Sequence, residues 1–403
     1  MVARYRSVLS APGCTRLFAT ALLARLPQGM STLAILLLVR SRTGSYAAAG
    51  VAVGAFALAT ATGAPVLGRL VDRLGRRRVV VPTAVAQAVS MVALVLVADD
   101  RAGAVALIVL AGLCGALLPP IAPTVRALLR EVLHDETVRE TAYSLESVIQ
   151  ELIWITGPLL VAVVIAASSP AVALLFCAAV CVCGTLLFVA SPLVAAAGPR
   201  ARDGEPRRSA VLAIPQLRTL LWPIALTGAG LGAIEVGLPS LALHAGSRPE
   251  AGLLLALWSA GSMTGGLWYG SRSWRVPLGA RYRRLLLAGV LLTAPLIVAR
   301  TIPEGAVFSL LAGLTTAPVF ACQYSLIGQV VTPGIETEAF TWVSAALIGG
   351  LAAGSALGGL AIGLTGVGGP FVLACAATGL AAASALRTRG VSAHSLKVRA
   401  ERA

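Results

Sequence analysis

The apolar residues of the chain fall into long runs separated by short polar and basic segments. A helix needs about 20 consecutive apolar residues to cross the hydrocarbon core of a bilayer. Because only helices and closed barrels satisfy their backbone polar groups within lipid, the pattern predicts an all-α integral membrane protein. The predicted transmembrane helices cover residues 17–39, 46–67, 79–98, 103–125, 143–167, 170–193, 219–243, 250–270, 284–300, 305–330, 340–363 and 368–387.

The basic residues between these spans are distributed asymmetrically. Most of the 32 Arg and Lys residues lie in the two termini and in every second connection. Cytoplasmic segments of membrane proteins carry such an excess of Arg and Lys, so both termini are predicted to be cytoplasmic. The connections predicted to be external contain only Arg40, Arg42, Arg101, Arg248 and Arg300.

The twelve predicted spans divide into two groups of six. Residues 194–216 between them are rich in Pro, Gly and Arg and are predicted to form a flexible cytoplasmic linker. The predicted organisation is therefore a six-helix bundle over 1–193, the linker, a second six-helix bundle over 217–388, and a cytoplasmic tail over 389–403. Arg-rich loops at matching places in the two halves suggest pseudo-symmetry.

Composition agrees with a membrane protein and removes several other classes. The chain is 57% hydrophobic and 12% charged, against roughly 45–50% and 25% for soluble domains. Its net charge of +15 is spread over short loops, which argues against a nucleic-acid partner. Lys397, the only lysine, lies in the polar tail, so the chain has no phosphate-binding Walker loop. We therefore expect no enzymatic activity and no cofactor.

The seven cysteines and three histidines do not indicate a metal site. Most of the cysteines lie inside apolar spans, where cysteine behaves as a small hydrophobic residue. The histidines His134, His244 and His394 are far apart, and none is spaced from a cysteine as zinc ligands are. We therefore expect no bound metal.

The connection between the second and third spans reads GRLVDRLGRRR over residues 68–78. Its pattern and position resemble the signature loop of the major facilitator superfamily. The resemblance implies two six-helix bundles that rock about a central site, and a secondary active transporter of small solutes. It also implies that Asp72 latches the two halves near the start of the eleventh helix, where the helix dipole favours an anion. The gating residues are then Gly68, Asp72, Arg73, Gly75, Arg76, Arg77 and Glu146.

Two features leave that gating role open. A run of arginines also serves as a simple topology anchor. In addition, Glu336 and Glu338 precede the eleventh span and would compete with Asp72 for its positive end.

Charged and polar residues inside spans are costly and usually functional. Arg25 lies within the first span, with Gln28 on the same face three residues later. We expect Arg25 to bind an anionic group in the cavity or to pair with an acid. The alternative is that its side chain extends to the cytoplasmic headgroups.

The fifth span contains two acids and a tryptophan with distinct predicted roles. Glu146 lies near the cytoplasmic end and is predicted to pair with Arg126 or with the arginines of residues 68–78. Glu151 lies deeper and is predicted to be a protonatable group or the partner of Arg25. Trp154 shares its helical face and either stacks against a substrate or simply packs.

The resemblance places the first, fourth, seventh and tenth helices around the substrate cavity. Glu235 on the seventh span, with Gln323 and Tyr324 on the tenth, is then predicted to face the substrate, and Glu235 to take part in proton coupling or substrate binding. Small-residue repeats predict close helix packing: Gly50-x-x-x-Gly54, Gly261-x-x-x-Gly265 and Gly350-x-x-x-Gly354-x-x-x-Gly358.

Two marks of drug–proton antiporters in this family are incomplete. The fourth span has no internal charge, with Arg126 at its predicted cytoplasmic end, and Gly157-Pro158 lacks the paired glycines that usually follow. The prediction is a proton-coupled exporter of a small organic molecule, monomeric and multi-pass in the cell membrane among its lipids. The alternatives are a uniporter or importer of a metabolite, or a non-transporting receptor or assembly partner.

Overall fold

The computed structural model describes residues 2–99, 103–196, 211–246 and 250–385, and every element in this part of the chain is a helix. All twelve predicted spans coincide with helices. The predicted tail 389–403 and most of the linker 194–216 lie outside the described residues. In the first half the helices are α1 (Val2–Ser10), α2 (Cys14–Thr43), α3 (Tyr46–Leu74), α4 (Arg76–Asp99), α5 (Ala104–Ala116), α6 (Ile121–Val132), α7 (Glu136–Ala167), α8 (Pro170–Val189) and α9 (Pro192–Ala196).

The second half follows the same plan. Its helices are the 3₁₀ turn η1 (Val211–Ala213), α10 (Pro215–His244), α11 (Glu250–Gly270), α12 (Leu278–Thr293), the 3₁₀ turn η2 (Ala294–Ile297), α13 (Ile302–Gly313), α14 (Thr316–Val330), α15 (Glu336–Thr365) and α16 (Gly369–Ser384). The described part of the chain contains nine helical segments that are long and apolar enough to cross a membrane. The predicted spans outside those nine correspond to α11, α12 with η2, and α16.

Several helices extend past the predicted spans or are interrupted within them. The fourth span is broken at Pro119 and Pro120 into α5 and α6, and α6 continues to Val132. The predicted loop 68–78 is mostly helical, because α3 runs to Leu74 and the chain reverses at Gly75 alone. Gly75 adopts φ 92°, a conformation that glycine tolerates without strain.

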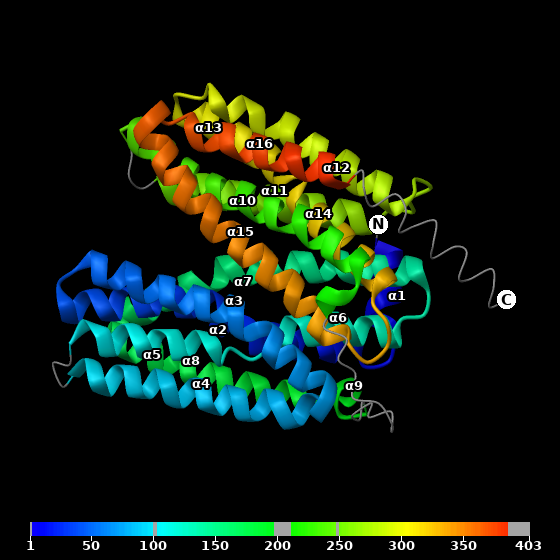
Figure 1. Cartoon of the computed structure of the whole chain (residues 1–403), viewed down its shortest axis with the longest axis horizontal. Coiled ribbons are helices and arrows are strands. Elements are labelled where there is room, and N and C mark those ends of the chain that lie inside the picture. The colour runs from blue at the N-terminus through cyan, green and yellow to red at the C-terminus, as the bar shows by residue number, and fades with distance from the viewer. Residues whose placement is uncertain (1, 100–102, 197–210, 247–249, 386–403) are drawn as a thin grey trace.

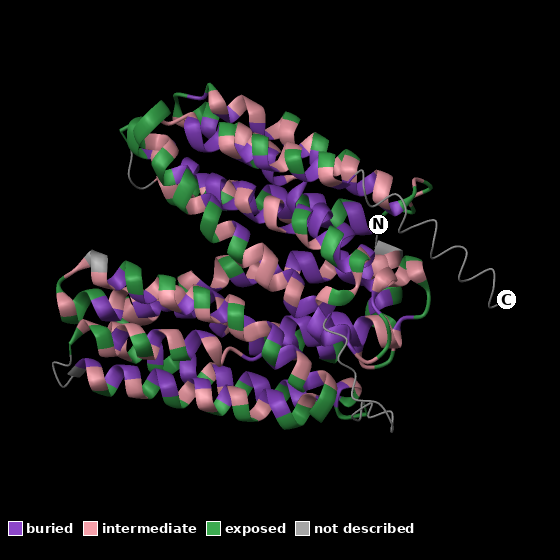
Figure 2. Cartoon of the chain, viewed as in Figure 1, coloured by how far each residue is buried: buried purple, intermediate pink, exposed green. Residues whose placement is uncertain are grey.

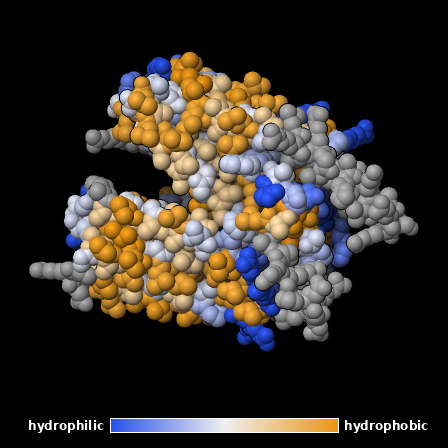
Figure 3. Space-filling view, viewed as in Figure 1, coloured by the Kyte–Doolittle hydropathy of each residue, from blue (hydrophilic) through white to orange (hydrophobic). Residues whose placement is uncertain are grey.

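The helices form two groups that meet at one end and separate at the other (Figure 1). Helices α2–α8 make up one group and α10–α16 the other, with α15 running obliquely from the second group onto α3. The space between the groups is a hollow that opens at the left of Figure 3. The groups meet where α3 turns into α4, the end predicted to be cytoplasmic, so this cleft opens toward the predicted external side.

The outward surfaces of both groups are apolar. Buried residues lie inside each group and where the groups meet (Figure 2), whereas large apolar side chains cover the outside. Val105 is 73% exposed, Leu291 is 73% exposed and Leu364 is 84% exposed. Exposed apolar surface on this scale would be unfavourable in water, and lipid tails solvate it.

Glycines set the close approach of helices within each group. A Cβ added to Gly350 or Gly354 on α15 would overlap the carbonyl oxygens of Ala225 or Ala229 on α10. An added Cβ on Gly261 of α11 would similarly overlap the carbonyl oxygen of Leu310 in α13, and one on Gly265 would overlap that of Leu314, just after α13. The prediction was wrong for Gly50 and Gly54, which have no described neighbour within contact distance of an added Cβ.

We expect Gly354→Ala to destabilise the protein by about 1–3 kcal/mol, because the methyl group would force α10 and α15 apart. A lower melting temperature in detergent would measure the effect. Gly349→Ala on the same helix is the matched control, since an added Cβ there meets open space and alanine favours the helix. Equal melting temperatures for the two variants would contradict the packing described here.

Candidate functional site

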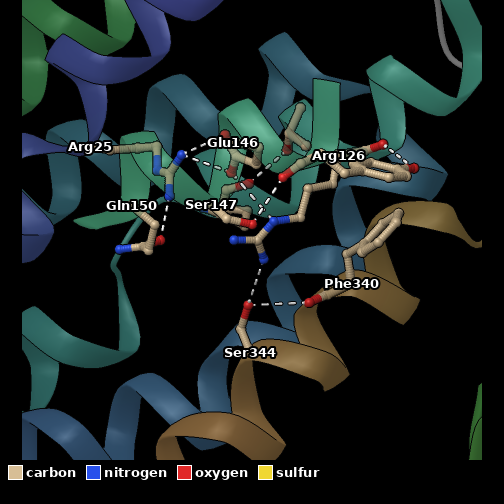
Figure 4. Close-up of polar contacts among 10 residues, drawn as sticks. Arg25, Arg126, Glu146, Ser147, Gln150, Phe340 and Ser344 are labelled. Carbon is tan, nitrogen blue, oxygen red and sulfur yellow. Dashed lines mark hydrogen bonds and ion pairs between the residues drawn. The ribbon is translucent and has the colours of Figure 1, made fainter. Parts of the chain in front are cut away.

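A buried polar cluster lies where the two groups of helices meet (Figure 4). The Arg25 guanidinium donates to both carboxylate oxygens of Glu146, at 2.8 and 2.9 Å, and to the side-chain oxygen of Gln150. Arg126 approaches the same carboxylate from α6, with its Nε 3.3 Å from Glu146 Oε1. Relative exposure of the Arg25, Arg126 and Glu146 side chains is at most 4%, so two guanidiniums share one carboxylate away from water.

The backbone of α2 and α7 places Arg25 beside Glu146. Gly29 on α2 and Gly157 on α7 lie directly against each other's helix, with no room for a Cβ at either position. Pro27 on α2 and Pro158 on α7 lie next to this crossing. The close approach brings the long Arg25 side chain onto the face of α7 that carries Glu146 and Gln150.

Arg126 was placed wrongly at the end of the fourth span. It lies inside α6, is 3% exposed, and contacts the opposite group of helices. Its guanidinium stacks 3.9 Å from the ring centroid of Tyr324 on α14, and its Nη1 lies 3.5 Å from Ser344 Oγ on α15. The apolar residues that follow Arg126 in the sequence were the signal that the helix continues.

Glu151 does not pair with Arg25, so that alternative was wrong, while its role as a protonatable group stays a prediction. Its carboxylate accepts a hydrogen bond from Ser262 Oγ on α11, at 2.9 Å, and Ser262 in turn accepts from the backbone N–H of Ala317, at 3.1 Å. Within the described residues, Ser262 is the only hydrogen-bond partner of Glu151. A buried acid therefore joins the two groups of helices through a neutral hydroxyl.

The remaining predicted site residues lie at different depths. Trp154 is 45% exposed and lies one turn beyond Gln150 and Glu151 on the same face of α7. Glu235 on α10 is exposed, and Gln28 on α2 is half-buried. Gln323 is buried, and its amide nitrogen donates to Thr227 at 3.3 Å and Tyr282 at 3.1 Å.

Asp72 lies at the N-terminus of α15, across the interface between the groups. Its carboxylate accepts from the backbone N–H of Thr337 at 3.1 Å and of Glu338 at 2.8 Å. An added Cβ on Gly68 would overlap Thr341 Oγ1, so Gly68 allows α3 to reach α15. The first-turn N–H groups of a helix lack internal partners, and Asp72 satisfies two of them.

The two acids that were expected to compete with Asp72 are held elsewhere. Glu338 forms an ion pair with Arg69 at 2.8 Å. Glu336 forms an ion pair with Arg130 at 3.1 Å and accepts from the backbone N–H of Gly334. Their carboxylates therefore stabilise the contact between the groups rather than displacing Asp72.

The other residues of the predicted gating set are less closely involved in this contact. Arg76 pairs with Glu131 of α6 in its own group, and Arg73 and Arg77 are exposed. Glu146 was grouped with them, and its predicted pairing with Arg126 is confirmed. It lies deeper, fully buried between Arg25 and Arg126, and the arginines of residues 68–78 are not among its described partners.

Backbone carbonyl groups at the C-terminal ends of two helices also accept hydrogen bonds across the interface. Sequence reasoning missed these contacts. Four backbone carbonyl oxygens at the end of α11 accept hydrogen bonds from side chains of the first half. Ser144 donates to Gly266 at 2.6 Å and Thr141 donates to Gly270 at 3.1 Å. Tyr5 donates to Leu267 at 2.9 Å and Arg4 donates to Arg272 at 2.7 Å. At the end of α14, Arg130 donates to the carbonyl oxygen of Gly328 at 2.6 Å. We call these contacts, together with Asp72 on α15, the inner gate.

The architecture defines a class: a multi-pass helical membrane protein with two helix groups around a cleft that is closed at one end. A model of the Major Facilitator Superfamily matches residues 17–275, more than half of the chain. The chain belongs to the Major Facilitator Superfamily, a family of membrane transporters. No curated protein sequence matches the chain.

Solved structures share the fold at low identity. The human organic anion transporter MFSD10 (TETRAN) is 19% identical, with a TM-score of 0.73 over 93% of this chain and 99% of that chain. A bacterial homologue of the iron transporter ferroportin, in an outward-facing state, is 15% identical, with a TM-score of 0.75 over 93% and 99%. The *E. coli* fucose:proton symporter is 13% identical, with a TM-score of 0.71 over 94% and 99%.

Proposed function

We propose that the protein is a proton-coupled exporter that moves a small organic solute by alternating access. The supporting arrangement is a cleft closed at one end by the inner gate and open at the other. The bundles would be residues 1–193 and 217–388, moving as units in a monomer of the cell membrane, with both termini in the cytoplasm. Alternating access requires that such contacts break while their counterparts at the other end form.

The observation that carries proton coupling is the position of Glu151. Burial without a positive partner favours the neutral, protonated form of a carboxyl, whereas an ion pair favours its charged form. Its partner, Ser262, belongs to the opposite group of helices, so the hydrogen bond joins the two halves. Gain or loss of a proton on Glu151 would therefore change the contact between halves that must separate.

The structural relatives do not select a solute. Their printed names refer to an organic anion, iron, and fucose with a proton, and at this identity the similarity covers the fold. The proposed export is an antiport, in which a proton moves inward as the solute moves outward. An antiporter binds solute and proton in turn. Glu151 on α7 and Glu235 on α10 are the two acids that we propose for that alternation.

We expect Glu151→Gln to abolish the pH dependence of solute binding, because glutamine keeps the shape but carries no titrating proton. The measurement is intrinsic tryptophan fluorescence against a panel of small solutes from pH 5 to 8. Glu304→Gln, an exposed capping residue of α13, is the matched control and should behave as wild type. An unchanged pH dependence in Glu151→Gln would show that another group carries the proton. Solute binding without pH dependence in both wild type and variant would favour a uniporter or importer.

A further inference from the structure

The polar cluster of Arg25, Arg126 and Glu146 carries an excess of positive charge. Arg25 and Arg126 are both buried and share the single carboxylate of Glu146. Arginine stays protonated in proteins, whereas Glu151 is turned toward Ser262 on α11. A buried charge without a full counter-charge is costly, so the cluster is short of one negative group.

The two arginines differ in where their partners come from. Arg25 is held by Glu146 and Gln150, both on α7 in its own half. Arg126 is held on one side by Glu146, and on the other by Tyr324 and Ser344 of the opposite half. Separation of the halves at the inner end would leave the Arg25 contacts intact and strip Arg126 of those two partners.

The contacts that Arg126 would lose are weak substitutes for an anion. Its distance to Ser344 Oγ is 3.5 Å, against about 2.7–2.9 Å for a charge-assisted hydrogen bond. Its other contact is the face of the Tyr324 ring. The opposite half therefore covers the guanidinium without neutralising it.

We propose that Arg126 binds the carboxylate or sulfonate of an aromatic organic anion when the cleft faces the cytoplasm. The proposal rests on the alternating access proposed above. Closing the inner gate would bring Tyr324 and Ser344 onto Arg126 in place of the anion and release it toward the open side. An inside-negative membrane potential favours the outward movement of a negative charge.

Neighbouring groups suit an aromatic anion. The side-chain nitrogen of Gln150 is buried without a hydrogen-bond partner among the described residues and is a neutral donor beside the cluster. Tyr143 and Phe320 contact Tyr324, and Phe340 contacts Tyr143, with ring centroids of these pairs 6.1–6.3 Å apart. This aromatic group includes residues of both halves, so its surface would be divided when they separate.

The test measures binding of four matched probes by tryptophan fluorescence: benzoate, benzenesulfonate, neutral benzamide and cationic benzylamine. Asp72→Ala, which weakens the inner gate, provides a background enriched in the inward-facing state. We expect both anions to bind that background at least tenfold more tightly than wild type, and benzamide and benzylamine to bind weakly. Arg126→Gln in the same background should weaken anion binding at least tenfold, and Arg126→Lys should weaken it less.

Arg139→Gln is the matched control, because Arg139 lies on α7 and donates to Leu133 within its own half. It should leave anion binding unchanged, and melting curves should show all variants folded. Preference for benzylamine, unchanged benzoate affinity in Arg126→Gln, or no binding of either anion would overturn the proposal. Anion binding that depends on Arg126 but not on pH would refute proton coupling alone and leave the anion site standing.

Discussion

Glu146→Gln should destabilise the folded protein by about 3–5 kcal/mol, the cost of leaving a buried ion pair without one partner. The substitution removes the only carboxylate within reach of Arg25 and Arg126 in the described part of the chain. Two positive charges would then face each other in a region without water. The measurement is the melting temperature and the yield of monodisperse protein in detergent.

Glu338→Gln is the matched control for this prediction. It also removes a glutamate from an ion pair of 2.8 Å, but the side chain of its partner Arg69 is 43% exposed. Exposed pairs contribute roughly 0–1 kcal/mol, so we expect a small change. The role assigned to Glu146 would be lost if both variants melted at the same temperature, or if Glu146→Gln melted like wild type.

Asp72→Ala should speed amide hydrogen exchange in the first turn of α15 by about 10–100-fold. The substitution removes the acceptor for the N–H groups of Thr337 and Glu338, and hydrogen bonds to charged groups contribute about 1.5–3 kcal/mol. Because these bonds cross the interface, the inner ends of α11 and α14 should also exchange faster. Exchange mass spectrometry on the intact protein would measure all three segments.

Asp135→Ala provides a control with the same chemistry and a different topology. Asp135 accepts from the N–H groups of Thr137 and Val138 at the start of α7, and these bonds from Val138 and Thr137 lower its pKa. Its contacts stay within one half, so exchange should rise in the first turn of α7 and remain unchanged in α15. Faster exchange confined to Thr337 and Glu338 in Asp72→Ala would show that Asp72 is a local cap and not part of a latch.

Properties that the surrounding lipid imposes on the chain could be predicted from the sequence. Lipid requires each crossing segment to be long and apolar, so the positions of the helices follow from the apolar runs alone. The turn at Gly75 also follows from local chemistry, since few residues adopt its backbone conformation. Family membership rested on a single loop, and the match over residues 17–275 confirms it.

Contacts between distant segments could not be predicted in this way. Arg126 interrupts an apolar run in the sequence, and its contacts with Glu146 and Tyr324, which make its burial tolerable, come from distant segments. The predicted partner of Arg25 rested on how far each acid lies along α7, and this distance did not distinguish Glu146 from Glu151. Gly50 and Gly350 begin repeats with the same spacing, and spacing alone does not reveal which of them meets another helix.

The inner gate has a chemical character that bears on how easily it opens. Its contacts include backbone N–H groups capped by Asp72 and backbone carbonyls capped by Tyr5, Ser144 and Arg130. Each of these groups can exchange its partner for a water molecule, which offsets part of the cost of breaking the contact. Separation of packed apolar side chains would instead expose apolar surface without such compensation. Water entering between these helix ends would therefore act as a replacement ligand for their backbone groups, and hydration would accompany any separation of the two groups of helices.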